Sequence, residues 1–177
     1  MKALKFLTLV VGILCGSIIN AQNTSSDSNR GYHVKVGDFS PELTLNLITG
    51  ETISLTDMKG KVIVLQFTAS WCSVCRKEMP HLENEIWLPN KDKNFILIGI
   101  DYDESIEKVF DFAQQMKITY PMALDPGGKH FNQFAYPKSG VTRNVVIDQE
   151  GRIVFLTRLY NVKEFEEMKN TIKNLLN

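Results

Sequence analysis

Two apolar runs of β-favouring residues mark the middle of the chain. They occupy residues 62–67 (VIVLQF) and 95–100 (FILIGI), and neither alternates regularly with polar residues. Strands with such runs usually lie in the interior of a sheet that is covered on both faces. The sequence therefore predicts two central strands.

Helical patterns follow both runs. Residues 73–88 can form a helix after the first strand, and Asp103-Glu104-Ser105 can open another after the second. The apolar residues expected on the buried side of this later helix are Ile106, Val109, Phe110, Ala113 and Met116. The order strand, helix, strand, helix predicts a parallel βαβ unit.

Alternating patterns predict a hairpin on each side of this unit. Residues 43–47 alternate between leucine and polar residues, and a turn at Gly50 leads into residues 52–55. Nearer the other end, residues 144–148 and 152–157 flank the turn sequence QEG. The sheet is therefore expected to be mixed.

The remaining segments predict a closing helix and an irregular connection. Asn161 can cap a helix whose inward residues are Phe165, Met168, Ile172 and Leu175. Residues 125–138 are rich in Gly, Pro and aromatic residues, which is typical of a connection without regular structure.

The N-terminus has the pattern of a secretory signal. Lys2 and Lys5 precede an apolar stretch over residues 6–19, and Asn20-Ala21-Gln22 supplies the small residue before a cut. We expect residues 1–21 to be a signal peptide and the protein to be exported to the periplasm.

Anchoring is a secondary expectation. The apolar stretch is shorter than the roughly 20 residues of a spanning helix, but an uncleaved signal would tether the protein to a membrane. Cys15 would suit lipidation, but the large Leu14 precedes it. Residues 22–33 are predicted to be a flexible linker and residues 34–177 one folded domain.

The charge balance argues against one class of partner. Twenty Lys plus Arg balance twenty Asp plus Glu, and no long run of one sign occurs. Such a chain has no field that would attract a phosphate backbone. We expect a monomer that binds no nucleic acid.

Two cysteines carry the candidate chemistry. Trp71-Cys72-Ser73-Val74-Cys75 follows a buried strand and opens a helix. Backbone N–H groups and the helix dipole there stabilise a thiolate, so Cys72 is the expected attacking sulfur. Cys75 lies on the same side of the first turn and can resolve a mixed disulfide.

A zinc half-site is the competing interpretation of this cysteine pair. Zinc needs about four ligands, and the chain's histidines, His33, His81 and His130, have no matching paired spacing. We therefore predict no metal and no other cofactor.

Four short segments carry a family resemblance: Val36-Gly37-Asp38, Gly60-Lys61, the strand end Ala69-Ser70-Trp71-Cys72, and Lys77-Glu78-Met79-Pro80. Together they resemble the TlpA/ResA family of thioredoxin-like proteins over residues 34–177. The resemblance implies an α/β thioredoxin-like fold: a central mixed β-sheet flanked by helices, with an N-terminal β-hairpin extension and a βα insertion.

The resemblance also implies a function. Members are exported thiol-disulfide oxidoreductases, commonly reductants, and some prepare apocytochrome c cysteines for haem attachment. The implied partners are proteins with disulfides and an upstream electron donor in the membrane. A redox-active disulfide between Cys72 and Cys75 is implied as well.

Further site residues follow from the resemblance. Glu78 matches an acidic residue held near the disulfide, where a raised pKa would let it move protons. Gln66 stands where thioredoxin has a buried aspartate, and its neutral amide cannot do acid-base work. Trp71 is a candidate platform for substrate.

Thr142 falls where thioredoxins carry a cis proline. A cis bond before threonine would cost about 3 kcal/mol, so a trans bond is expected. Thr142 and Arg143 are then candidates to contact a substrate or the thiolate.

Three alternatives stay open. A disulfide oxidase or isomerase uses the same motif at a different potential. A peroxiredoxin-like thiol peroxidase could use Arg143, but that class has a threonine three residues before its cysteine, where Ala69 stands and Thr68 is one place early. A copper-binding chaperone could use both sulfurs with His81 or His130.

Overall fold

The computed structural model describes residues 30–177. The predicted signal peptide and the first eight residues of the predicted linker lie outside the described residues. Within residues 30–177, the helices are too short or too polar to cross a membrane.

The described chain forms one seven-stranded mixed sheet in the order β2-β1-β5-β4-β3-β6-β7. Its strands are β1 Thr44–Leu47, β2 Thr52–Ser54, β3 Val62–Thr68, β4 Phe95–Tyr102, β5 Met122–Asp125, β6 Arg143–Ile147 and β7 Ile153–Leu156. β3, β4 and β5 are parallel, and the other pairings are antiparallel. The thioredoxin-like fold class predicted from the sequence is confirmed.

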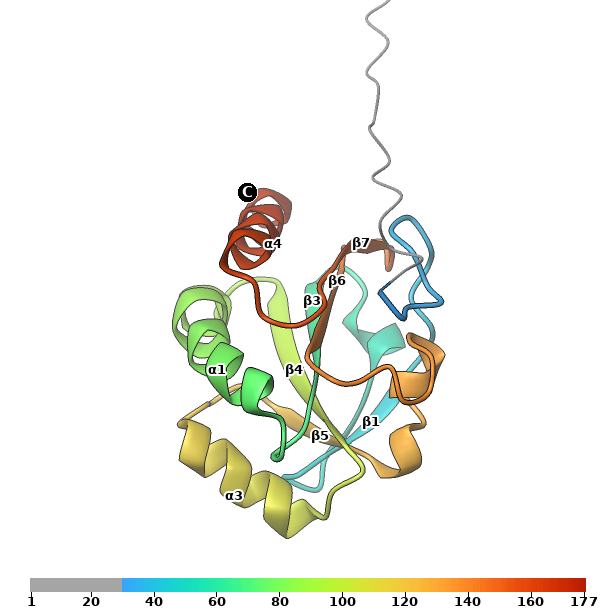
Figure 1. The fold of residues 1–177 in the computed structure, drawn as a ribbon. Coiled ribbons are helices and arrows are strands. Elements are labelled where there is room, and N and C mark those ends of the chain that lie inside the picture. Colours follow the sequence, from blue (N-terminus) through green and yellow to red (C-terminus); the bar gives the residue numbers. More distant parts are fainter. Residues whose placement is uncertain (1–29) are drawn as a thin grey trace, which may run out of the picture.

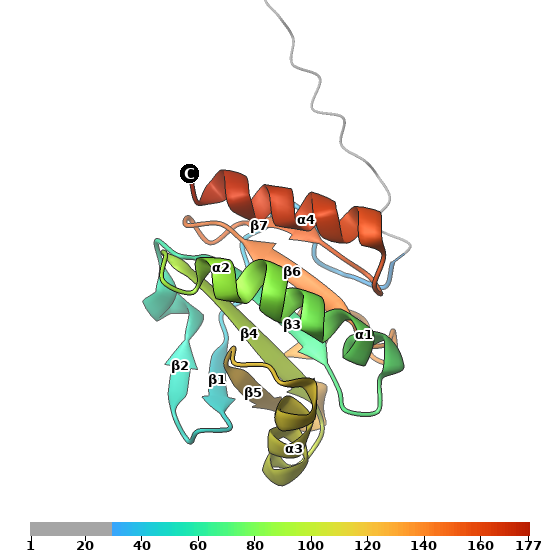
Figure 2. The ribbon, with the colours of Figure 1, turned by 90° about the vertical axis from the view of Figure 1, so that its left-hand side faces the viewer.

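The helices cover one face of this sheet (Figures 1 and 2). They are α1 Ser73–His81, α2 Leu88–Asn90, α3 Ile106–Met116 and α4 Val162–Leu175. A π-helical stretch, Leu82–Trp87, joins α1 to α2, so the predicted helix over residues 73–88 is confirmed as one interrupted unit. Pro80 lies just before this stretch, where its missing N–H favours a local change in hydrogen bonding.

Two hydrophobic cores lie on the two faces of the sheet, and alternation along each strand decides which side chain joins which core. In β3, Val62 and Val64 face the helices, whereas Ile63, Leu65 and Phe67 face the opposite core. Successive side chains in a strand point to opposite faces. Gln66 and Thr68 therefore face the helices.

The opposite core is covered by irregular segments. Tyr32, Leu43, Phe131 and Phe134 contribute to it from the chain before β1 and from the connection between β5 and β6, drawn in blue and orange in Figure 1. The Phe67 ring contacts the Phe131 ring edge-on at 5.6 Å. The Gly- and Pro-rich connection thus contributes to the core, although it contains only two short 3-10 turns.

One strand has no local signal in the sequence, and one sequence prediction needs correction. No pattern marks β5, because its four residues, MALD, have little β propensity and follow a proline. In α3, Phe110 is 51% exposed and Ile106 40%, whereas Phe112 is buried. The inward stripe is Val109, Phe112, Ala113 and Met116, the regular spacing for a helix that packs on one side.

The folded domain begins before Val34. Tyr32 is buried, its hydroxyl donates to the carbonyl of Thr157 at 2.6 Å, and the Arg143 guanidinium lies 4.5 Å from its ring centroid. Arg30 forms a two-pronged ion pair with Glu164 at 2.5 and 2.9 Å. Residues 30–33, predicted to belong to the linker, are packed against the domain.

Replacing Tyr32 tests this boundary. Tyr32→Ala should lower the free energy of unfolding by about 3 kcal/mol, because it opens a cavity in the core. Tyr32→Phe keeps the ring and should lose about 1 kcal/mol with the hydrogen bond. Chemical denaturation measures both, and an alanine variant as stable as the wild type would show that this segment does not stabilise the domain.

Candidate active site

The two cysteines lie where β3 passes into α1. Cys72 is the N-cap of α1, and its Sγ accepts a hydrogen bond from the Cys75 backbone N–H at 3.2 Å. Cys72 is partly exposed, whereas Cys75 is fully buried. Both thiols are free, so the structure shows the reduced dithiol.

The pKa values of the two thiols move in opposite directions. A hydrogen bond from the Cys75 thiol, another from the Thr142 hydroxyl and the N–H groups of Cys75 and Val74 lower the pKa of Cys72 to about 5, against partial burial. The hydrogen bond to Cys72 and burial raise the pKa of Cys75 well above its usual range. At neutral pH, Cys72 is the thiolate and Cys75 keeps its proton.

Thr142 lies against both sulfurs. Its Oγ1 is 3.0 Å from Cys72 Sγ and 2.9 Å from Cys75 Sγ. Its φ is +67°, an unusual value for a β-branched residue. Hydrogen bonds from its N–H to the Phe67 carbonyl and from the Leu159 N–H to its own carbonyl hold this conformation. The peptide bond before Thr142 is trans, as expected from the sequence.

Glu78 is buried beside the dithiol and is held by two amides. Asn144 Nδ2 donates to its Oε1 at 2.8 Å, and Gln66 Nε2 donates to its Oε2 at 3.3 Å. The Tyr120 hydroxyl donates to Gln66 Oε1 at 2.8 Å and so fixes the orientation of that amide. Burial, opposed by the two amide hydrogen bonds and assisted by the Cys72 charge, raises the pKa of Glu78 to about 7.

Strand alternation explains why these side chains meet. Gln66 in β3 shares a face with Val64, and Asn144 in β6 shares a face with Val146, so both point toward the helices. The two residues are also direct partners across the β3–β6 pair. Glu78 on α1 lies over them and accepts a hydrogen bond from each.

Glu104 clamps the loop before Cys72. Its carboxylate accepts hydrogen bonds from the Ser70 N–H at 2.5 Å and the Ser70 hydroxyl at 2.7 Å, and it pairs with Lys108 at 2.6 Å. From α1, Arg76 Nε donates to the Ser70 carbonyl at 2.7 Å. The loop that carries Trp71 and Cys72 is therefore fixed from two sides.

Asp101 is a buried acid beside this clamp. No N–H or O–H group of the described residues donates to either of its carboxylate oxygens. Burial and the neighbouring Glu104 carboxylate raise its pKa to about 8. Protonated Asp101 can donate to Glu104, which avoids two adjacent negative charges.

The other predicted site residues are placed differently. Trp71 is 63% exposed next to Cys72, as a docking platform requires. Arg143 is buried, and its guanidinium donates to the carbonyls of Gly140, Arg30 and Ser139. The side chains of Arg143 and Asn144 lie on opposite faces of β6. The Arg143 guanidinium is therefore not presented to the thiolate or to a substrate.

The arginine that a peroxidase would place at its thiolate is absent from the described surroundings of Cys72, because Arg143 is bonded to backbone carbonyls inside the domain. The Thr68 hydroxyl does contact the Cys75 thiol, and it lies 3.7 Å from Met79 Sδ. Over residues 30–177, no cluster of three or more His, Cys, Asp or Glu side chains could hold a metal ion. The described site is that of a dithiol with a buried acid.

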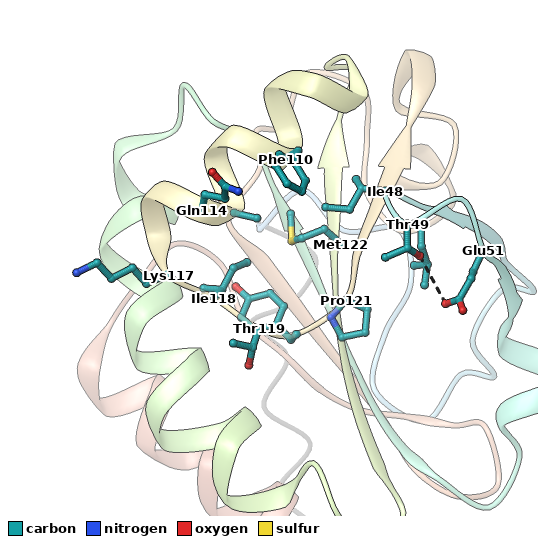
Figure 3. Close-up of a pocket in the computed structure, with 13 residues that line it drawn as sticks. Ile48, Thr49, Glu51, Phe110, Gln114, Lys117, Ile118, Thr119, Pro121 and Met122 are labelled. Carbon is teal, nitrogen blue, oxygen red and sulfur yellow. Dashed lines mark hydrogen bonds between the residues drawn. The ribbon is translucent and has the colours of Figure 1, made fainter.

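A groove of about 370 Å³ lies apart from the sulfurs, between α3 and the turn that joins β1 and β2 (Figure 3). Phe110, Ile118 and Met122 are among its lining residues, and neither cysteine is. Tyr120 also lines the groove, and its hydroxyl donates a hydrogen bond to Gln66 Oε1. The groove thus approaches the buried network without opening onto the dithiol.

Sequence reasoning missed Asn144, Tyr120, Asp101 and Glu104. Asn144 could have been found, because Asn144 and Val146 alternate with the apolar residues of a predicted strand, which puts Asn144 on the same face as Val146. The other three depend on how strands and helices pack, and no local pattern marks them.

The Glu78 pKa predicts a pH-dependent stability. The folded protein binds this proton more tightly than the unfolded chain, because the pKa rises from 4.5 to about 7. Ionisation of Glu78 therefore destabilises the folded protein. It should lower the free energy of unfolding by about 3 kcal/mol as pH rises from about 4.5 to about 7. Glu78→Gln should remove that part of the slope in denaturation curves measured across this range.

Glu42→Gln, at an exposed carboxylate, is the matched control and should keep the wild-type slope. If Glu78→Gln also keeps that slope, the folded protein does not raise the pKa of Glu78, and the carboxylate is then a weaker base than this geometry implies.

Comparisons with known proteins agree with this geometry. Residues 36–156, more than half of the chain, match the AhpC/TSA family. The thiol-disulfide oxidoreductase ResA of Bacillus cereus is 31% identical over 153 residues, which cover 85% of each chain.

Two solved structures share the fold. A candidate protein disulfide isomerase of Bacteroides thetaiotaomicron is 52% identical, with a TM-score of 0.80, over 82% of this chain and 92% of that one. A candidate thiol:disulfide interchange protein DsbE of Chlorobium tepidum is 26% identical, with a TM-score of 0.72, over 81% and 99%. The chain therefore belongs to the AhpC/TSA family of thioredoxin-like proteins and is a thiol-disulfide oxidoreductase similar to ResA.

Proposed function

We propose that the protein is exported and reduces disulfide bonds of other proteins through Cys72 and Cys75. The signal pattern over residues 1–21 supports export to the periplasm. An electron donor in the membrane would restore the dithiol after each turnover. Apocytochrome c, whose cysteines must be reduced before haem attachment, is one substrate class that the ResA resemblance suggests.

The observation that carries the proposed mechanism is the buried carboxyl of Glu78, which lies one turn of α1 after the buried Cys75. In the first step, the Cys72 thiolate attacks a substrate disulfide, the S–S bond breaks, and one substrate sulfur leaves with the electron pair. In the second, Cys75 loses its proton to Glu78 and attacks Cys72 Sγ. The second substrate sulfur then leaves, and the enzyme is left as the disulfide.

A base near Cys75 favours this second step, which releases the substrate in reduced form. With a pKa of about 7, Glu78 is partly ionised at neutral pH and can take the proton there. Burial, which raises the pKa of Cys75, persists in the mixed disulfide and would leave this species long-lived without a base. Glu78 is thus proposed as the proton acceptor of resolution.

Substrate docking is proposed at Trp71. Trp71 offers an exposed ring directly beside the attacking sulfur. Thr142 borders the same sulfur just before β6, but it is fully buried and is not included as a docking residue. Arg143 is not included, since its guanidinium is occupied by backbone carbonyls inside the domain.

A second candidate function, disulfide oxidation or isomerisation, is favoured by the Cys72 pKa of about 5. A stabilised thiolate stabilises the reduced enzyme and makes its disulfide more oxidising. The two candidates share every step up to the mixed disulfide and differ in reduction potential.

The reduction potential of the Cys72/Cys75 pair decides between them. Equilibration of the purified protein with glutathione or dithiothreitol mixtures should give a value below about −230 mV for a reductant, and one above about −150 mV for an oxidase or isomerase. Cys75→Ser should accumulate a mixed disulfide that Cys72→Ser cannot form. Failure of the wild type to form the intramolecular disulfide would contradict both functions.

A further inference from the structure

We propose that the Thr142 hydroxyl is a catalytic group whose hydrogen bond follows the negative charge from Cys72 to Cys75 during the exchange. The inference deepens the proposed function, because it concerns the same dithiol. It assigns to Thr142 a role in proton and charge placement, which is distinct from contact with a substrate.

The starting arrangement follows from counting donors and acceptors. A hydroxyl has one proton to donate, and Thr142 Oγ1 lies 3.0 Å from one sulfur and 2.9 Å from the other. Thr142 is fully buried, and the two sulfurs are the hydrogen-bond partners found for its hydroxyl among residues 30–177. In the reduced enzyme the Cys72 thiolate is the charged acceptor, and a charged acceptor takes the stronger hydrogen bond.

Thr142 therefore donates to Cys72 first. The Cys75 thiol is a donor within reach of both Cys72 Sγ and Thr142 Oγ1. Whichever of these the thiol proton points to, the Thr142 proton is directed at the thiolate. This hydrogen bond is one of the causes that lower the pKa of Cys72.

The charge then changes place while the oxygen stays where it is. Once Cys72 has attacked, its sulfur is bonded to the substrate sulfur and carries no charge. Cys75 next loses its proton, which the proposed function assigns to Glu78, and becomes a buried thiolate that needs hydrogen-bond donors. The Thr68 hydroxyl is one donor within reach of this sulfur. The Thr142 hydroxyl can rotate about its C–O bond and donate to this thiolate across 2.9 Å.

Resolution completes the balance. The Cys75 electron pair forms the bond to Cys72 Sγ, the bond between Cys72 and the substrate sulfur breaks, and its electron pair leaves on the substrate. The Thr142 hydroxyl keeps its proton throughout, and at the end neither sulfur beside it carries a charge. One side chain thus stabilises both anionic states of the enzyme in turn.

The backbone around Thr142 keeps the hydroxyl at this point. Its N–H donates to the Phe67 carbonyl at 3.0 Å and its carbonyl accepts from the Leu159 N–H at 2.9 Å. Proline at this position could supply neither the hydroxyl nor the N–H. Valine is the closest variant without the hydroxyl, because it has the same branching and nearly the same volume.

The test is a pH titration of the thiolate by ultraviolet absorbance in the reduced wild type, Thr142→Val and Thr142→Ser. We expect valine to raise the Cys72 midpoint by about one pH unit or more, as removal of a hydrogen bond to a charged group predicts. Serine, which restores the hydroxyl, should stay close to the wild type.

A second measurement tests the hydrogen bond to the Cys75 thiolate that forms during resolution. The mixed disulfide formed with a small aromatic disulfide should persist about tenfold longer in Thr142→Val than in Thr142→Ser, because the Cys75 thiolate loses one of its two hydroxyl donors and keeps only Thr68. If valine prevents folding, Thr142→Ala replaces it with the same two expectations. Wild-type midpoints and lifetimes in the folded variant without the hydroxyl would overturn the proposal.

These measurements fail independently of the proposed function. The titration needs neither a substrate protein nor an electron donor. An oxidising potential together with a shifted valine midpoint would contradict the reductant and leave the Thr142 role standing. A reducing potential together with an unshifted Cys72 midpoint in the valine variant would support the reductant and contradict the Thr142 role.

Discussion

A thiolate and a thiol three residues apart have to be kept in different protonation states, and the rest of the site depends on this asymmetry. Cys72 caps α1 and is partly exposed, and hydrogen bonds from the Cys75 thiol, the Thr142 hydroxyl and backbone N–H groups lower its pKa. Cys75 is buried one turn further on, and its pKa rises. The attacking sulfur is therefore charged and accessible before substrate arrives, whereas the resolving sulfur is inactive until a nearby base takes its proton.

That base is Glu78 on α1, and the alternation of side chains along β3 and β6 places its hydrogen-bond partners beneath it. On the helix-facing side, β3 and β6 bury Val62, Val64 and Val146, and next to these valines Gln66 and Asn144 are paired across the two strands. Their amides donate hydrogen bonds to Glu78 at a position buried from solvent, and this burial raises the pKa of Glu78. The same alternation turns Arg143 to the other face, where it packs on Tyr32 and secures the start of the domain. One geometric rule thus supplies both the proton acceptor and a structural anchor.

Much of this arrangement could be predicted from the sequence, and what was missed has a common cause. Long apolar runs and capped helices located β3, β4, α1 and α4 because they are local patterns. β5 was missed because four residues after a proline acquire strand geometry only by pairing with β4 and β1. The motif located both cysteines and Glu78, and the trans bond before Thr142 followed from its energetic cost. The inward Arg143 and the clamp formed by Glu104 depend on tertiary contacts between elements distant in sequence.

The most direct test of this account is the pH dependence of alkylation at each cysteine of the reduced protein, resolved by mass spectrometry. The account predicts that Cys72 reacts with a midpoint at about pH 5, whereas Cys75 stays protected through the neutral range because it is buried and protonated. A Cys72 midpoint near the ordinary cysteine value of about 8.5, or equal reactivity of the two thiols, would contradict it.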